Sequence, residues 1–195
     1  MGYIDNIKEY IPANEQESSD KALILEFIKK NNKNVLSRSN GIAHITSSGF
    51  IMNRKLDSVL FVHHNIRDTW AWTGGHADGD EDLLAVALRE AQEETGLSRI
   101  KPQTSKIASL DILVNFGHIR KGQYISAHLH LSVAYILIAD ENEETKINPD
   151  ENSGVKWFSA DSVNDKTFLP GDVYLYRKLI KRAKKEFYIS GDNKL

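Results

Sequence analysis

The sequence has no cysteine among its 195 residues. Disulfide bonds, thiolate metal ligands and a cysteine nucleophile are therefore excluded. The chain also lacks an apolar run long enough for a signal peptide or a membrane-spanning helix. These absences are typical of a cytoplasmic protein, and we expect that location and no contact with a membrane.

Neither sign of charge dominates the composition. With 25 Lys and Arg against 27 Asp and Glu, the net charge is −2, so the chain has no global basic field for nucleic acid. The exception is the expected C-terminal helix, which carries a group of basic residues: Arg177, Lys178, Lys181, Arg182, Lys184 and Lys185. We interpret them as a solvated helix face, because late cations suit a helix C-terminus. RNA binding is the alternative interpretation.

The length fits one domain with a sizeable core and a short extension. Residues 1–39 are predicted to be an N-terminal helical extension that packs on the fold or forms a homodimer interface. Its helical patterns lie at 3–11 and 23–28, with a polar stretch at 14–19 between them. Residues 40–190 are predicted to form the main domain, and the whole chain a single structural unit.

The main domain alternates strand-like and helical patterns. Its last helix, at 172–187, is expected to turn Val173, Tyr176, Ile180 and Phe187 inward. Strands on both sides of a central helix indicate an α/β or α+β fold. The expected strands lie at 42–52, 59–62, 107–116, 126–138 and 155–158.

Residues 75–97 are predicted to form a glycine turn followed by an amphipathic helix. Glu90, Glu93 and Glu94 stand at i, i+3 and i+4, so their carboxylates cluster on one side. Crowded carboxylates repel one another unless a cation lies among them, and hard oxygen ligands suit Mg²⁺ or Mn²⁺. A solvated acidic face is the alternative for such a run considered by itself.

The same helix has signals for burial and for both of its ends. Asp80 or nearby acids suit the first turn, and Gly96 suits the C-terminal stop. The expected buried stripe is apolar and lies away from the glutamates. It consists of Leu84, Ala87, Leu88 and Ala91.

The wider pattern of this stretch resembles the Nudix box, Gly-x5-Glu-x7-Arg-Glu-U-x-Glu-Glu-x-Gly-U, where U is apolar. Ala91 and Leu97 occupy the two U positions. A chance match of all seven fixed positions is expected on the order of once in 10⁸ start positions. The resemblance implies the family's α/β/α sandwich around a central mixed sheet. The fixed positions are filled by Gly75, Glu81, Arg89, Glu90, Glu93, Glu94 and Gly96.

The Nudix resemblance also implies a role for each box residue. Metal binding is carried over to the three glutamates Glu90, Glu93 and Glu94, completed by the backbone carbonyl of Gly75. Arg89 is expected to hold the glutamate cluster by charge pairing, and Glu81 to brace the loop and helix. Both are supporting residues.

The general base is open between two glutamates. Family members draw the base either from the box, which favours Glu90, or from a later loop. Glu151 stands in a polar loop before a short strand, where some members keep that glutamate. An ordinary loop acid beside Asp150 is the alternative for Glu151.

Three histidines are candidate substrate contacts. His76 follows Gly75 directly and is therefore expected near phosphates. His128 and His130 share one face of their strand and point either into a substrate cleft or halfway into solvent. We expect no metal set among the histidines, because the glutamates already supply one.

The resemblance implies an enzyme acting on phosphorus-containing acid anhydrides. It would be a Mg²⁺-dependent hydrolase, with Mn²⁺ possible, that cleaves a diphosphate linkage in a nucleoside diphosphate bonded to another group. Metal-activated water would attack phosphorus. Its partner would be a small nucleotide, and nucleic acid is not expected.

Two other functions remain open. A non-catalytic nucleotide-sensing Nudix module usually loses box residues, and this box is intact. An RNA 5′-end pyrophosphohydrolase is supported only by the basic terminal helix. An isopentenyl diphosphate isomerase on the same fold is set aside, because that enzyme uses a cysteine. The sequence matches none of the residue signatures that distinguish Nudix enzymes by substrate, so it does not indicate which nucleoside diphosphate derivative is cleaved.

Overall fold

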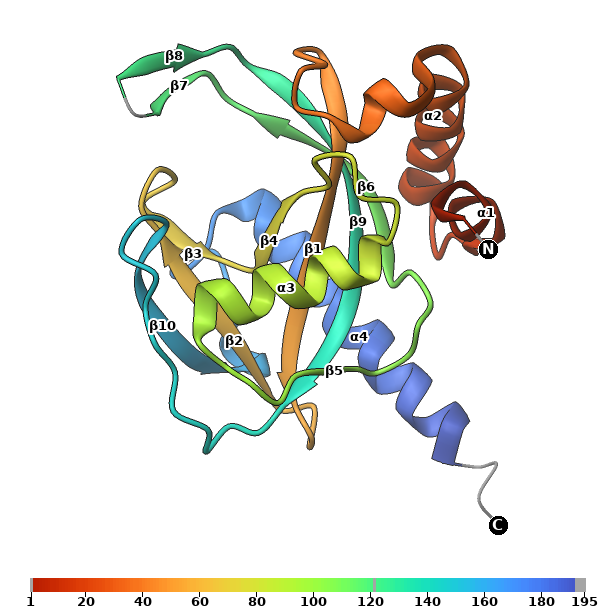
Figure 1. Ribbon diagram of the computed structural model, residues 1–195. Helices are drawn as coiled ribbons and strands as arrows, with labels where there is room; N and C mark the ends of the chain where they lie inside the picture. The colour runs from red at the N-terminus through yellow and green to blue at the C-terminus, as the bar shows by residue number, and fades with distance from the viewer. Residues whose placement is uncertain (1, 121, 192–195) are drawn as a thin grey trace. The chain divides into compact units, whose positions relative to one another are not determined.

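The computed structural model describes residues 2–120 and 122–191, with side chains except those of Lys33, Arg120 and 187–191. The predicted inward position of Phe187 lies outside the described side chains. Figure 1 shows four α-helices in the described chain. They are α1 (Tyr3–Glu9), α2 (Glu15–Asn31), α3 (Leu83–Thr95) and α4 (Pro170–Gly191), with short 3₁₀ turns at Asn32–Leu36 and Ala160–Ser162.

Hydrogen bonding between neighbouring strands follows the order β10-β2-β1-β9-β5. Strand β3 pairs with β2, β4 with β1 and β6 with β9, while β7 and β8 form a separate hairpin. The strands are β1 (Ala43–Asn53), β2 (Ser58–His64), β3 (Thr69–Ala71), β4 (Thr73–His76), β5 (Lys101–Pro102), β6 (Ser109–Asn115), β7 (His118–Arg120), β8 (Gln123–Ile125), β9 (His128–Ala139) and β10 (Asn152–Ser159).

The chain divides into two compact units. The first comprises Met1–Ser48, Gly74–Ala87 and Ser105–Tyr135. The second comprises Gly49–Thr73, Leu88–Thr104 and Ile136–Leu195. Strand β1, strand β9 and helix α3 each lie partly in the first unit and partly in the second.

In the first unit, α2 is anchored on β6 by polar side chains from its first turns. Gln16 Nε2 donates to Asp111 Oδ1 at 3.1 Å, and Asp20 Oδ2 accepts from the Ile112 amide at 3.0 Å. Asn14 caps the helix by accepting from the Glu17 amide at 2.9 Å. The polar stretch predicted to separate two helical patterns is therefore the start of α2. The prediction was wrong because these polar side chains bond to a strand far along the chain.

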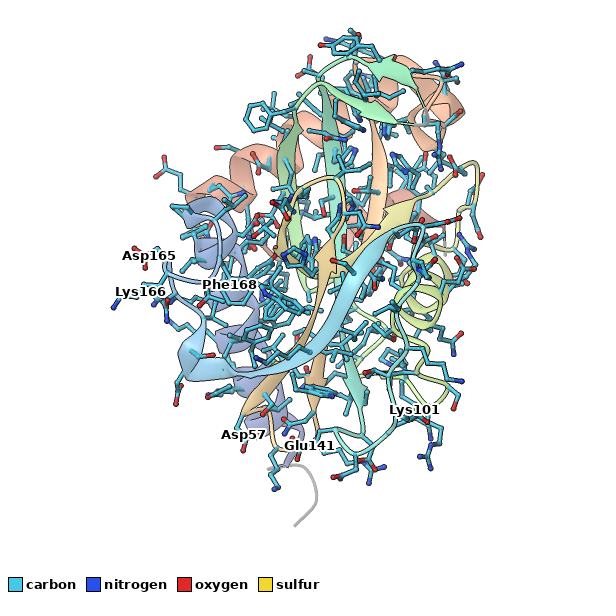
Figure 2. All side chains as sticks on the ribbon, turned by 90° about the vertical axis from the view of Figure 1, so that its left-hand side faces the viewer. Asp57, Lys101, Glu141, Asp165, Lys166 and Phe168 are labelled. Carbon is cyan, nitrogen blue, oxygen red and sulfur yellow. The ribbon has the colours of Figure 1, made fainter. Side chains whose placement is uncertain are left out.

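In the second unit, strands pack around a core of aromatic rings. Strand β2 lies between β1 and β10, both antiparallel to it, with Leu60 opposite Ile51 and Trp157. The Phe61 ring lies 4.6 Å from that of Phe168, labelled in Figure 2, and 4.8 Å from that of Tyr176. These rings join β2 to α4 and to the loop before it.

The layers of the second unit confirm the predicted fold. The C-terminal half of α3 lies on one face of the strands and α4 on the other (Figure 1). On α4, Val173, Tyr176 and Ile180 are buried, as the sequence indicated. The chain is thus an α+β protein with a central mixed sheet. No helix in the described ranges combines the length and apolar character that crossing a bilayer demands.

The buried stripe of α3 is displaced from the predicted one. Ala87 and Ala91 are buried as expected, but Leu84 and Leu88 are only half-buried. The stripe instead runs one position earlier and includes Leu83, Val86, Glu94 and Thr95. The sequence pattern was misleading because the helix buries polar residues in its last turn, where an apolar pattern gives no signal.

Both ends of α3 have hydrogen-bonded caps. Asp82, rather than Asp80, accepts from the Ala85 amide at 3.0 Å. Gly96 follows the last helical residue with φ +71°, and its amide bonds to the Gln92 carbonyl at 2.9 Å. This left-handed position is the helix stop that the sequence indicated.

Replacing Gly96 with Ala should lower the free energy of unfolding by about 2 kcal/mol or more. The left-handed conformation costs a residue with a Cβ about 1–2 kcal/mol. The new Cβ would also lie 2.8 Å from Lys146 Cβ and 3.1 Å from the Lys146 amide nitrogen. Urea denaturation measures the change. Gly79→Ala is the matched control, because Gly79 also has positive φ but open space around its Cβ position. Equal losses in both variants would show that the Lys146 contact contributes nothing.

Candidate active site

The three box glutamates lie on the part of α3 that belongs to the second unit. Glu94 is buried, with 4% of its surface exposed, while Glu90 is half-buried and Glu93 exposed. Arg89 lies beside them, with its Nη2 atom 3.5 Å from Glu90 Oε1. This ion pair is the contact that a supporting role for Arg89 requires.

Glu90 has an altered acidity. Burial raises its pKa above the ordinary value, and the neighbouring charge of Glu93 raises that pKa further, with Arg89 opposing both. The charge of Glu151 also raises the pKa of Glu90. The structure therefore brings the loop glutamate into the electrostatic neighbourhood of the box glutamates, which the sequence alone left open.

A buried asparagine fixes the loop that carries Glu151. The side chain of Asn152, 1% exposed, donates from Nδ2 to the Glu94 carbonyl oxygen at 2.9 Å. On the other side, the Glu151 carbonyl accepts from the Asn65 amide at 2.9 Å. The backbone of Glu151 is thus held directly by Asn65, and the next residue is held through the Asn152 side chain. Sequence reasoning missed Asn152, because its partner is 58 residues away and no local pattern marks it.

Asn152→Ala should lower both stability and turnover. It leaves the Glu94 carbonyl without this donor in a buried place, which costs about 1–3 kcal/mol of unfolding free energy. It also releases the loop that positions Glu151, so we expect kcat to fall about tenfold at a temperature where the variant remains folded. Urea denaturation and steady-state kinetics measure the two effects. Asn142→Ala, at an exposed position in the same loop, is the control and should change neither quantity.

The remaining predicted residues lie in the first unit. Gly75 is half-exposed near the end of β4, and Glu81 is exposed before α3 begins. His76, His128 and His130 gather with a fourth histidine, His44. One ring nitrogen from each lies within 4.8 Å of the others. The structure thus gathers four histidines whose nitrogens could share a metal ion, a grouping that the sequence did not predict. His44 was missed because nothing in its strand segment distinguishes it from an ordinary core residue.

The glutamates fit a hard divalent cation by their chemistry. Their oxygen donors are those that Mg²⁺ and Mn²⁺ prefer. Glu90 is half-buried, and its negative charge is repelled by that of Glu93. A divalent ion beside the two carboxylates would relieve this repulsion. Among the described residues, the group of possible ligands with closely spaced donor atoms is that of the four histidines and does not include these glutamates.

A family model described as the NUDIX domain matches residues 43–179. The chain belongs to the Nudix family. The predicted family is therefore confirmed, and the predicted enzyme class, a hydrolase of phosphorus-containing acid anhydrides, is confirmed with it. Nudix hydrolases generally use divalent metals. The match covers the main domain and leaves α1 and α2 outside it.

Curated Nudix relatives share about a quarter of their residues with this chain. A probable DHNTP pyrophosphohydrolase of Lactococcus lactis subsp. cremoris is 26% identical over 141 residues, 72% of this chain and 80% of that protein. An RNA pyrophosphohydrolase of Pelagibacter ubique is 26% identical over 140 residues, 69% of this chain and 84% of that protein.

Solved structures share the Nudix fold. A C. elegans Ap4A hydrolase, solved as a binary complex, has a TM-score of 0.52 and 15% sequence identity, covering 75% of this chain and 98% of its own. A Nudix-family hydrolase from Clostridium perfringens has a TM-score of 0.50 and 20% identity, covering 71% of this chain and 96% of its own. At these identities the likeness concerns the fold alone.

Proposed function

We propose that this chain is a Mg²⁺-dependent hydrolase that cleaves a diphosphate linkage in a nucleoside diphosphate bonded to another group. The observation that carries the proposal is the grouping of four glutamates. The charges of Glu93 and Glu151 both raise the pKa of Glu90, and the Glu151 loop is bonded to the backbone of Glu94 through Asn152. Mn²⁺ has the same ligand preference and could replace Mg²⁺.

Each residue has a separate task in this proposal. Glu90, Glu93 and Glu94 hold the ion through carboxylate oxygens, and Arg89 fixes the orientation of Glu90 by its ion pair. The bound ion supplies positive charge to the phosphate oxygens and lowers the pKa of a coordinated water. Glu81 is proposed as a brace of the turn before α3.

Glu151 is the proposed general base. It accepts the proton of the attacking water while an oxygen–phosphorus bond forms and the bridging bond of the diphosphate breaks. Glu90 is the competing base, but its ion pair with Arg89 and its position beside Glu93 suit ion binding better. Glu151 has no such cationic neighbour in the ion pairs described.

The substrate panel combines general nucleotide classes with compounds named for similar proteins. The general classes are nucleoside diphosphate sugars, ADP-ribose and nucleoside triphosphates. The named compounds are DHNTP, Ap4A and 5′-triphosphorylated RNA. Phosphate release is measured with Mg²⁺, with and without added phosphatase, beside the Glu94→Gln protein. Turnover of one compound class that requires both Mg²⁺ and Glu94 supports the proposal and identifies the substrate group. Tight nucleotide binding without turnover of any compound would instead support the nucleotide-sensing module.

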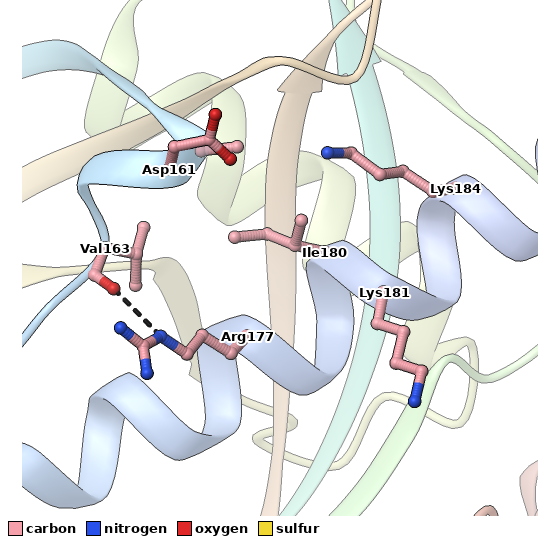
Figure 3. A pocket seen from close by; sticks show the side chains of 7 residues that line it. Asp161, Val163, Arg177, Ile180, Lys181 and Lys184 are labelled. Atoms are coloured by element: carbon pink, nitrogen blue, oxygen red, sulfur yellow. Dashed lines mark hydrogen bonds between the residues drawn. The ribbon is translucent and has the colours of Figure 1, made fainter.

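An RNA 5′-end pyrophosphohydrolase is the second candidate. It is favoured by the Pelagibacter relative and by a surface pocket of about 380 Å³ beside α4 (Figure 3). Arg177, Lys181 and Lys184 line this pocket, and Arg177 Nε donates to the Val163 carbonyl at 3.0 Å. RNA binding that weakens steeply with salt, and is lost in a Lys181→Ala, Lys184→Ala double variant, would favour this candidate. Salt-independent or absent RNA binding would exclude it.

A further inference from the structure

Four histidines from three strand segments converge inside the first unit. The ring centroid of His44 lies 4.9 Å from that of His76, 4.8 Å from that of His128 and 5.2 Å from that of His130. His44 is 2% exposed, and the other three are half-buried. If two or more of these rings were protonated, their like charges would repel one another at such distances.

Backbone hydrogen bonds place these rings together. The Leu129 amide donates to the Ile42 carbonyl at 2.9 Å, which aligns the start of β9 with the start of β1. On the other side of β1, the Ala77 amide donates to the Ile45 carbonyl at 3.2 Å. His44 therefore lies between His76 on one side and the β9 histidines on the other. Figure 1 shows β4, β1 and β9 side by side, in keeping with their pairing in the sheet.

A glycine lets β4 approach β1 so closely. A Cβ added at Gly74 would lie 2.6 Å from Ser48 Oγ and 2.8 Å from the Ser47 carbonyl oxygen. Any larger residue there would push the strands apart, and His76 with them. The position of His76 beside His44 is therefore built into the sheet.

Hydrogen bonds to backbone carbonyls turn ring nitrogens into the cluster. His44 Nδ1 lies 3.0 Å from the Asn40 carbonyl oxygen, and His128 Nδ1 lies 2.8 Å from the Ser126 carbonyl oxygen. A carbonyl accepts only from a protonated nitrogen, so in both rings Nδ1 donates and Nε2 keeps its lone pair. This arrangement, with a backbone carbonyl behind the ring, is how metal-binding histidines are oriented in proteins.

Two ring nitrogens already lie at a distance suited to a shared ion. His128 Nε2 and His130 Nε2 are 3.1 Å apart and share a hydrogen bond, in which His130 Nε2 donates because His128 Nδ1 carries the proton of its own ring. A bound ion would replace this proton between the two nitrogens. Two nitrogens bound at 2.0–2.1 Å in a tetrahedral zinc site would be about 3.3 Å apart. His44 Nε2 is buried and has no hydrogen-bond partner. A buried polar atom without a partner is costly, and an ion among the rings would satisfy it.

We propose that His44, His76, His128 and His130 bind one first-row transition-metal ion of the Zn²⁺ class. Neutral imidazole nitrogens suit Zn²⁺, Cu²⁺, Ni²⁺ and Co²⁺, whereas Mg²⁺ requires oxygen ligands. The site is therefore separate in its chemistry from the glutamates, and the proposal does not depend on the hydrolase function. Its ligands come from β1, β4 and β9, so the ion links three strand segments of one unit.

Binding of an anion by protonated histidines is the less favourable interpretation. His44 is buried, and burial disfavours the charged ring that anion binding would require. The nearby Asp78 carboxylate is paired with Arg38, whose Nε donates to Asp78 Oδ1 at 2.8 Å, so this carboxylate is already neutralised. An imidazole lone pair binds a metal cation, whereas phosphate requires N–H donors.

One neighbour must move when the ion binds. Asn115 Nδ2 lies 3.2 Å from His128 Nε2 and 3.3 Å from His130 Nε2, so its amide donates to the His128 lone pair and occupies the space beside both nitrogens. Asn115 is the residue paired with His128 across the ladder between β6 and β9. Rotation of its side chain presents the amide oxygen instead, which would accept from an ordered water or approach the ion.

The first test is titration of the full chain, after chelator treatment, with Co²⁺ and Zn²⁺. Visible absorption follows Co²⁺ ligation, and competition with a chromophoric chelator measures Zn²⁺ affinity. We expect one ion per chain. His44→Ala and His130→Ala should each weaken binding by about 100-fold or more, because loss of a mere supporting contact already costs about 10–100-fold. His118→Ala, at a half-buried histidine outside the cluster, should bind as the unaltered chain does.

Two further measurements keep the result decisive. Glu93→Gln should leave Zn²⁺ binding unchanged. If this variant no longer bound Zn²⁺, the ion would lie at the glutamates and the proposal would be overturned. If His44→Ala does not fold, NMR of the unaltered protein replaces it. Zn²⁺ should then shift the ring resonances of four of the seven histidines and leave those of His63, His64 and His118 unchanged. Absence of stoichiometric binding, or shifts at other histidines, would refute the site.

Discussion

Glu94→Gln should lower kcat/KM by at least about 100-fold while the fold remains intact. Gln has nearly the same shape, so the buried position at the end of α3 stays filled. It removes one negative charge from the ligand set, and a 100-fold loss corresponds to only about 3 kcal/mol of transition-state stabilisation. Steady-state kinetics on the substrate found in the panel measure the effect, with circular dichroism and urea denaturation as the folding check.

The matched control for this variant is Glu144→Gln. Glu144 is an exposed glutamate in the same unit, so the substitution makes the same change of charge at a position outside the site. It should leave kcat/KM unchanged. Equal losses in both variants would attribute the effect to net charge. Unchanged turnover in Glu94→Gln would remove Glu94 from the reaction altogether.

Glu151→Gln should lower kcat by about 10²–10⁴-fold, the usual contribution of a general base. The Mg²⁺ concentration needed for half-maximal activity should stay the same, because Glu151 acts on the water and does not hold the ion. Asp150→Asn is the control, since Asp150 is the exposed acid next to it. A parallel rise in the Mg²⁺ requirement would make Glu151 a ligand instead of a base. An unchanged kcat would make it an ordinary loop acid.

The sequence predicted most of the elements because their signals are local. The Nudix box predicted α3 and its stop at Gly96, which directly follows the last helical residue. Asp80 was expected in the first turn, but the helix begins at Leu83, and the nearby acid Asp82 precedes it. The apolar runs predicted β1, β2, β6, β9 and β10. The short strands β3, β5, β7 and β8 were not predicted, because pairs and triplets of residues carry no periodicity that can be recognised.

The contacts that assemble the site were not predictable from the sequence. Asn152 reaches Glu94, and His44 reaches His128, only after the sheet has formed. The buried stripe of α3 was also not predictable. Glu94 and Thr95 are buried by residues that pack against them in the fold, and their polar side chains give no signal of burial in the sequence. Residue types and spacing identify the metal-binding candidates, whereas partners distant in sequence require the fold.

The hydrogen bonds at the C-terminal end of α3 also affect the local unfolding of this helix. The last carbonyls of a helix have no partners within it. Here the Glu94 carbonyl is bonded by Asn152, and the Thr95 carbonyl accepts from the Lys146 amide at 2.8 Å. Fraying of the helix end must therefore break the loop's bonds at the same time. The two segments, far apart in sequence, form one cooperative opening unit, and amide hydrogen exchange should protect the Lys146 amide as strongly as the last turn of the helix.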